Sequence, residues 1–128
     1  MSLKDHRVRA TVAVSDIDRA VEFYEGKLGL SGRMGGRQLR IYECGGGSEL
    51  QVYESSDNAG KSPATVVSWS VPEFDSEIDE LLAAGVEFAR YDGLPTDDKG
   101  VHAFGDHKVV WFLDPDGNTI AIDNGGPI

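Results

Sequence analysis

The chain has 128 residues, of which 40% are hydrophobic and 27% are charged, and its formal net charge is -10 at pH 7. These values are typical of one globular domain. The acidic excess argues against nucleic acid and membranes as partners, because both attract basic surfaces. No apolar run reaches the about 20 residues of a membrane span. The polar N-terminus and the single cysteine, Cys44, favour a cytoplasmic protein without an internal disulfide.

Two stretches of the chain follow one pattern, in which an alternating strand leads into an amphipathic helix. The strands cover Val8–Val14 and Thr65–Val71, where every second residue is apolar. The apolar stripe of the first helix is Ile17, Ala20, Val21, Tyr24 and Leu28. The stripe of the second is Phe74, Ile78, Leu81 and Leu82. A cap at Ser15 is predicted to start the first helix, and Gly29 and Gly85 are predicted to end the two helices.

Turn residues divide the remainder of each half into three short strands. Gly35-Gly36 and Gly45–Gly47 predict two hairpins in the first half, and Asp114–Gly117 predicts a type I turn in the second. The order of strand, helix and three strands therefore occurs twice. We predict an α+β fold in which one domain, residues 1–128, contains two βαβββ modules at about 6–57 and 64–124.

Strand alternation also assigns a polar face, opposite the valines, leucines and isoleucines that must lie under the helices. This face carries Arg9, Thr11, Gln38, Arg40, Tyr42, Glu49, Gln51, Tyr53, Ser68, Ser70 and Thr119. An open sheet also exposes such a face to water without any ligand. Large arginine and tyrosine side chains nevertheless suit a site that orients a small molecule. The predicted ligand-binding residues are Arg9, Thr11, Arg40, Tyr42, Glu49, Gln51, Tyr53 and Ser68.

The stretch Gly93–Gly105 accounts for most of the extra length of the second half. It is rich in glycine, aspartate and proline and is long for an ordinary connection. We predict a mobile lid that brings His102, Phe104 and His107 to the ligand. The alternative is a surface excursion that does not contact a ligand.

Two motifs carry a resemblance to a known family. Val14–Tyr24 with Lys27–Leu30, and Val110–Ile120, are similar to the first-module opening and the last hairpin of the vicinal oxygen chelate superfamily, which includes glyoxalases, bleomycin-resistance proteins and extradiol dioxygenases. The resemblance extends over about residues 7–124. It implies curled sheets around a shared cleft that is lined by the polar strand face and often completed by a homodimer.

The resemblance also locates the four metal ligands of the metal-dependent members. The corresponding positions here are Arg9, Gln51 (or a residue one or two from it), Val66 and Ala121. An arginine cation repels a metal ion, and valine and alanine offer no lone pair. We therefore expect neither the metal nor another cofactor.

These observations favour a metal-independent protein that binds a small molecule, as bleomycin-resistance proteins do. The net charge suits a cationic ligand, whereas Arg9 and Arg40 suit a carboxylate or phenolate, and we give the local arginines more weight. An alternative is a superfamily enzyme of the lyase, isomerase or dioxygenase type. With no metal, Arg9 would polarise an oxyanion and Tyr42, Tyr53 or Glu49 would act as acid or base.

Overall fold

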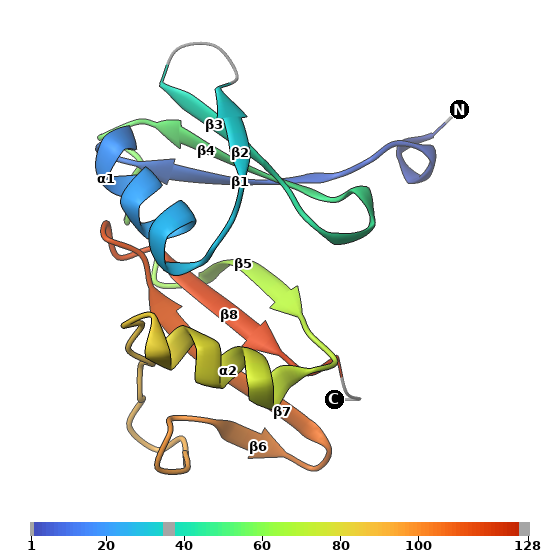
Figure 1. Ribbon diagram of the computed structural model, residues 1–128, viewed down its shortest axis with the longest axis vertical. Helices are drawn as coiled ribbons and strands as arrows, with labels where there is room; N and C mark the ends of the chain where they lie inside the picture. The colour runs from blue at the N-terminus through green and yellow to red at the C-terminus, as the bar shows by residue number, and fades with distance from the viewer. Residues whose placement is uncertain (1, 35–37, 126–128) are drawn as a thin grey trace.

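The computed structural model describes residues 2–34 and 38–125. It has the predicted α+β fold with two βαβββ modules (Figure 1). In chain order the elements are η1 (Leu3–Asp5), β1 (Arg9–Val14), α1 (Ile17–Val21), η2 (Glu22–Lys27), β2 (Gly32–Met34), β3 (Leu39–Glu43), η3 (Gly45–Gly47), β4 (Glu49–Glu54), β5 (Thr65–Ser70), α2 (Phe74–Ala83), β6 (His102–Phe104), β7 (His107–Leu113) and β8 (Thr119–Asp123). The predicted hairpin at Gly35-Gly36 lies outside the described residues.

Within the described residues, each module forms one four-stranded sheet. The strand order is β1-β4-β3-β2 in the first sheet and β5-β8-β7-β6 in the second. In each sheet the first and last strands of the module are parallel and the other pairs are antiparallel. β1 and β5 lie side by side, and α1 and α2 cover the same side of the two sheets (Figure 1). We call the opposite side the open face.

The first helix begins one residue later than predicted. Oδ1 of Asp16 accepts hydrogen bonds from the backbone N–H groups of Asp18 at 2.9 Å and Arg19 at 3.2 Å, so Asp16 is the N-cap. Ser15 is not available for this role, because its backbone N–H and its hydroxyl both donate to Asp116. The π-helical segment η2 continues α1 toward Gly29, which has a φ of 74°.

The second helix ends as predicted. Gly85 has a φ of 93°, a conformation that glycine adopts without strain. Its N–H donates to the carbonyl of Leu82, and the N–H of Val86 donates to that of Leu81. No helix in the described ranges is long and apolar enough to cross a membrane.

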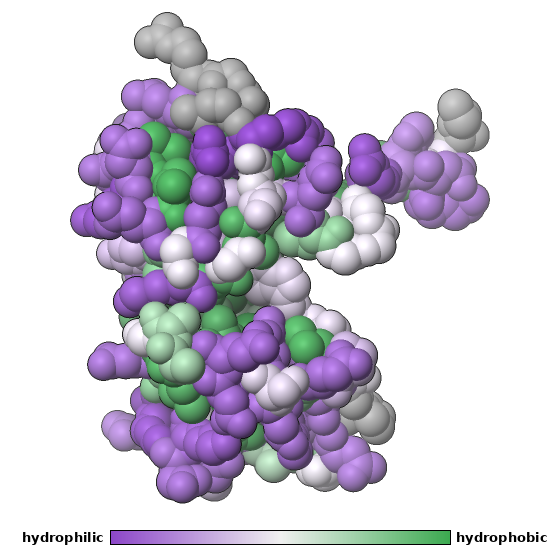
Figure 2. Space-filling model, viewed as in Figure 1, coloured by the Kyte–Doolittle hydropathy of each residue, from purple (hydrophilic) through white to green (hydrophobic). Residues whose placement is uncertain are grey.

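The core lies between the helices and the side of the sheets that they cover. Val12, Val14, Leu50 and Val52 of the first sheet are at most 1% exposed, and so are Val110, Phe112 and Ile120 of the second. Phe23 of η2 packs against Phe112 with ring centroids 6.2 Å apart, which joins the two modules. Burial of such side chains stabilises the fold by about 1.5–3 kcal/mol each. On the helix-covered side drawn in Figure 2, hydrophilic residues dominate and apolar areas are small.

A buried network of hydrogen bonds also joins the modules. We call it the inter-module clamp and define it as Asp114, Asp116 and Asn118 with their partners in module one. Oδ2 of Asp114 accepts from the Tyr24 hydroxyl at 2.8 Å and from Nδ2 of Asn118 at 2.8 Å. Nδ2 of Asn118 also donates to the carbonyl of Ala13 at 2.8 Å. The predicted type I turn is present, since the Gly117 N–H donates to the Asp114 carbonyl at 3.0 Å. This turn places Asp114, Asp116 and Asn118 within hydrogen-bond distance of module one.

Candidate functional site

Arg9 and Glu49 form an ion pair on the open face of the first sheet. They lie opposite each other on β1 and β4, and Oε1 of Glu49 accepts from Nη2 of Arg9 at 2.7 Å and from Nε at 3.1 Å. Nη1 of Arg9 is 3.4 Å from Oε1 of Gln51. The Arg9 hydrogen bonds hold the pKa of the Glu49 carboxyl below its usual value, with help from the charges of Arg9, Arg7 and Arg33. The positive charge of Arg9 is therefore balanced by the negative charge of Glu49.

Beside this pair the open face has a depression of about 400 Å³. It is lined by Thr11, Gln38, Leu39, Gln51, Tyr53 and Glu54. Three of these, Thr11, Gln51 and Tyr53, were predicted to bind ligand, and the structure brings them together. Their hydroxyl and amide groups both donate and accept hydrogen bonds without carrying charge. The depression thus suits polar groups of a small molecule, and Glu54 is the charged residue in its lining.

The predicted position of Arg40 and Tyr42 on the polar face is wrong. Tyr42 lies opposite Leu50 and Arg40 opposite Val52, so both point to the helix-covered side. Tyr42 is 0% exposed, and its ring stacks on that of Tyr24 at 6.2 Å. The reason is a partner on η2: the Arg40 guanidinium and the Tyr42 hydroxyl both donate to Oε2 of Glu25. Burial raises the pKa of Tyr42 to about 12.

The residues that replace them on the open face are apolar. Ile41 lies opposite Gln51, and Leu39 lies opposite Tyr53 at the depression. Both were predicted to lie under a helix. The open face of the first sheet therefore combines hydrogen-bonding groups with two aliphatic side chains.

The open face of the second sheet is aromatic. Ser68, Ala121 and Trp111 form a row across β5, β8 and β7, so Ser68 has the predicted orientation. The Trp111 ring is 5.7 Å from that of Tyr91 and 6.3 Å from that of His102, measured between centroids. This half of the open face provides ring surfaces where the first half provides hydrogen bonds.

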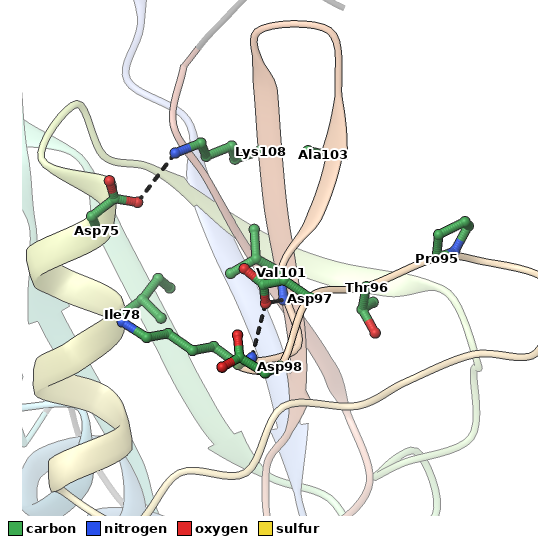
Figure 3. A pocket seen from close by; sticks show the side chains of 10 residues that line it. Asp75, Ile78, Pro95, Thr96, Asp97, Asp98, Val101, Ala103 and Lys108 are labelled. Atoms are coloured by element: carbon green, nitrogen blue, oxygen red, sulfur yellow. Dashed lines mark hydrogen bonds and ion pairs between the residues drawn. The ribbon is translucent and has the colours of Figure 1, made fainter.

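The loop that precedes β6, which was predicted to be a mobile lid, is attached to α2 and to Arg90. Nζ of Lys99 is 2.7 Å from Oδ1 of Asp79 on α2, which holds the loop to the helix-covered side. The Arg90 guanidinium donates to the carbonyls of Asp97 at 2.8 Å and Asp98 at 2.9 Å. Figure 3 shows the loop and α2 around a depression of about 520 Å³ on that side. Residues 97–99 of the loop therefore pack on the helix-covered side, while the Pro95 carbonyl contacts His102.

The three residues assigned to the lid belong to strands. His102 lies opposite Val109, and Phe104 lies opposite His107, the first residue of β7. Strand alternation places all three on the open face together with Trp111. They thus share a face with Ser68, although not as parts of a moving cover.

A family model described as the Glyoxalase/Bleomycin resistance protein/Dioxygenase superfamily matches residues 6–122. The match contains every strand of both sheets except Asp123, the last residue of β8. The chain belongs to this superfamily. Among curated proteins, no sequence matches the chain.

Solved structures show the same superfamily fold. A glyoxalase/bleomycin resistance protein from Catenulispora acidiphila is 24% identical, with a TM-score of 0.71 over 91% of this chain and 96% of its own. TioX from Micromonospora is 17% identical, with a TM-score of 0.66 over 92% and 97%. The fosfomycin resistance protein FosX from Listeria monocytogenes is 13% identical, with a TM-score of 0.65 over 96% and 93%. At these identities the likeness concerns the fold.

The donor set at the superfamily's metal positions does not fit a divalent ion. Val66 and Ala121 have no donor atoms, and Arg9 is a cation. Glu49, two residues before Gln51, does carry a carboxylate. It lies opposite Arg9 and forms an ion pair with the guanidinium. In residues 2–34 and 38–125 no group of three or more His, Cys, Asp or Glu side chains is arranged to hold a metal ion.

The sequence interpretation missed Trp111 and Tyr91. Val109–Leu113 is apolar throughout, so alternation alone does not distinguish the faces of this strand. Trp111 alternates with Val110 and Phe112, and because the structure buries these two completely, Trp111 points to the open face. Tyr91 lies outside the strands and had no comparable signal.

Proposed function

We propose that this superfamily member binds a small organic molecule on its open face without a metal ion. The observation that carries the proposal is the depression in which Thr11, Gln51 and Tyr53 meet beside the Arg9–Glu49 pair. The open face brings hydroxyl, amide and apolar groups together, as ligand sites commonly do. Bleomycin-resistance-like sequestration is the nearest functional model for such a site.

The ligand is not expected to carry a negative charge where it meets the first sheet, because Glu54 also lines the depression. Arg9 and Arg40 were the reasons to expect an anion, but each is paired with a glutamate. An anion at Arg9 would have to compete with Glu49, whose side chain is 9% exposed and already bonded. Hydrogen bonds from Thr11, Gln51 and Tyr53 carry no such penalty.

Binding is favoured over side-chain catalysis by the positions of the proposed acid and base groups. The Tyr42 hydroxyl is on the helix-covered side and bonds Glu25, so it does not face a ligand on the open face. The lowered pKa of Glu49 makes its carboxylate a weak base, and Arg9 occupies one of its oxygens. Tyr53 alone keeps the position that the catalytic alternative requires.

A matched pair of substitutions tests the proposal. We expect Tyr53→Phe to weaken a ligand found by calorimetric screening of oxygenated organic compounds by about fivefold, the effect of one lost hydrogen bond. Tyr42→Phe removes the same atom from the opposite side of the sheet and should leave the affinity unchanged. Titration calorimetry before and after treatment with a chelator measures both affinities and the metal dependence.

Two outcomes would contradict the proposal. Equal losses in the two variants would place the ligand elsewhere, and loss of binding after chelation would show that a metal is required.

We also propose a homodimer that completes the site. Support comes from residues 2–8, which project from the body of the molecule (Figures 1 and 2). Leu3 and Val8 in this stretch are 90% and 87% exposed. A projecting segment with exposed apolar side chains offers surface that a second subunit can bury, and two-fold pairing is the commonest arrangement of subunits.

Sedimentation at micromolar concentration should show a species of twice 13.8 kDa. Val8→Asp should increase the monomer fraction, because it would place a charge in the apolar contact. Leu82→Asp on α2 is the control and should not change it, although Leu82 is also exposed, at 37%. A wild-type monomer at this concentration would disprove the dimer. A Val8→Asp variant that remains dimeric would exclude residues 2–8 from the dimer interface.

A further inference from the structure

Trp111, His102 and Tyr91 form an aromatic corner on the open face of the second sheet. The planes of Trp111 and His102 are inclined by 30° and both side chains lie on the open face, so the two rings form the floor of the corner. The Tyr91 ring stands at 80° to Trp111 and forms a wall. A floor and a wall at this angle match the two favourable ring arrangements, offset stacking and edge-to-face contact.

Backbone contacts hold the three rings in place. Trp111 lies opposite Ala121, whose small side chain leaves room for the indole above the sheet. The Ala89 N–H donates to the Trp111 carbonyl at 2.7 Å, which fixes the segment leading to Tyr91 beside β7. Nδ1 of His102 is 2.7 Å from the Pro95 carbonyl, and since a carbonyl only accepts, Nδ1 carries the hydrogen. The corner is therefore formed before any ligand arrives.

The corner is exposed, and the strand positions around it carry little charge. Tyr91 is 44% exposed and the neighbouring Phe104 is 60% exposed, so much of their ring surface contributes nothing to the core. On the described strand positions of this open face there is no lysine or arginine, and Asp123 is the one carboxylate. Oδ1 of Asp123 accepts from the Gly125 N–H at 2.8 Å.

We infer that the aromatic corner is a subsite for an uncharged planar aromatic ring of the ligand. The inference rests on the proposed small-molecule function and names the ligand class. The ring lies on Trp111 and His102 with its edge against Tyr91. Polar groups on the same molecule are then recognised separately, by the hydroxyl and amide groups of the first sheet.

The test compares two uncharged probes, 2-naphthalenemethanol and its saturated analogue decahydro-2-naphthalenemethanol. Trp69→Phe leaves the Trp111 indole N–H as the one indole resonance, because the chain has two tryptophans. We expect 2-naphthalenemethanol to shift this resonance saturably and to bind about tenfold more tightly than the saturated probe. Tyr91→Ala should weaken its binding about tenfold and, being a surface change, should not unfold the protein. Leu82→Ala, at an exposed apolar position on α2, should leave the affinity unchanged.

Three results would overturn the inference. They are equal affinities of the two probes, an unchanged Trp111 resonance at saturation, and conversion of a dimer to monomer by Tyr91→Ala without a change in affinity, which would make the corner a subunit contact. The Tyr53→Phe comparison distinguishes the two proposals. If it weakens a screened ligand while the naphthyl probe does not bind, the proposed function stands and the aromatic subsite does not.

Discussion

Asp114→Ala should lower the free energy of unfolding by about 3–5 kcal/mol, the cost of leaving several buried polar groups without their partner. Asp114 is 4% exposed, and its carboxylate accepts four hydrogen bonds. The substitution would leave the Tyr24 hydroxyl, which is 0% exposed, without an acceptor. The melting temperature should fall by about 10–20 °C.

Denaturant unfolding followed by circular dichroism measures the effect. Tyr24→Phe removes one bond of the clamp and should cost about 1 kcal/mol, which keeps the comparison informative if Asp114→Ala does not fold. Asp57→Ala, at an exposed aspartate, is the control and should change stability by at most about 0.5 kcal/mol. A small loss for Asp114→Ala would mean that the clamp does not stabilise the fold.

Gly60→Ala should have the second largest effect, a loss of about 3 kcal/mol from backbone strain and overpacking together. Gly60 has a φ of 63°, and a Cβ there would lie 1.9 Å from the carbonyl oxygen of Asp116. Neither backbone segment can move freely, because the Gly60 N–H donates to Oδ1 of Asn118 at 3.1 Å.

A second glycine separates the two causes. Gly105 has a φ of 59°, but nothing lies within 4 Å of a Cβ built on it. Gly105→Ala should therefore show the conformational cost alone, about 1 kcal/mol. Thermal unfolding of both variants gives the steric part as the difference. Equal losses would show that the contact with Asp116 relaxes at no cost.

The sequence predicted the helices and the order of strands well, because each depends on a local pattern. The period of apolar residues marked both helices, and Gly85 ended the second in the expected conformation. Strand β3 was misassigned because its alternation is ambiguous. Leu39 and Ile41 are more apolar than Arg40 and Tyr42, yet Tyr42 is buried because Glu25 satisfies its hydroxyl. Hydropathy ranks side chains but does not reveal such a partner.

The candidate site was predictable in part for the same reason. Thr11, Gln51 and Tyr53 were found because β1 and β4 alternate clearly. The loop before β6 was recognised by its length, but its attachment depends on Lys99 and Asp79, which are 20 residues apart in the chain. Contacts of this kind are decided by tertiary packing, which no local pattern reports.

The bonds of Asn118 to Ala13 and Gly60 bear on how the protein meets its ligand. Asn118 precedes β8, Ala13 is in β1 and Gly60 is in the linker, so one side chain ties both modules and the segment between them. A hinge needs a connection that bends, and here that connection is pinned. Recognition then resembles docking onto a preformed surface, with little conformational entropy lost on association. Affinity should therefore depend on how well a molecule matches a fixed spacing between the polar half and the aromatic half.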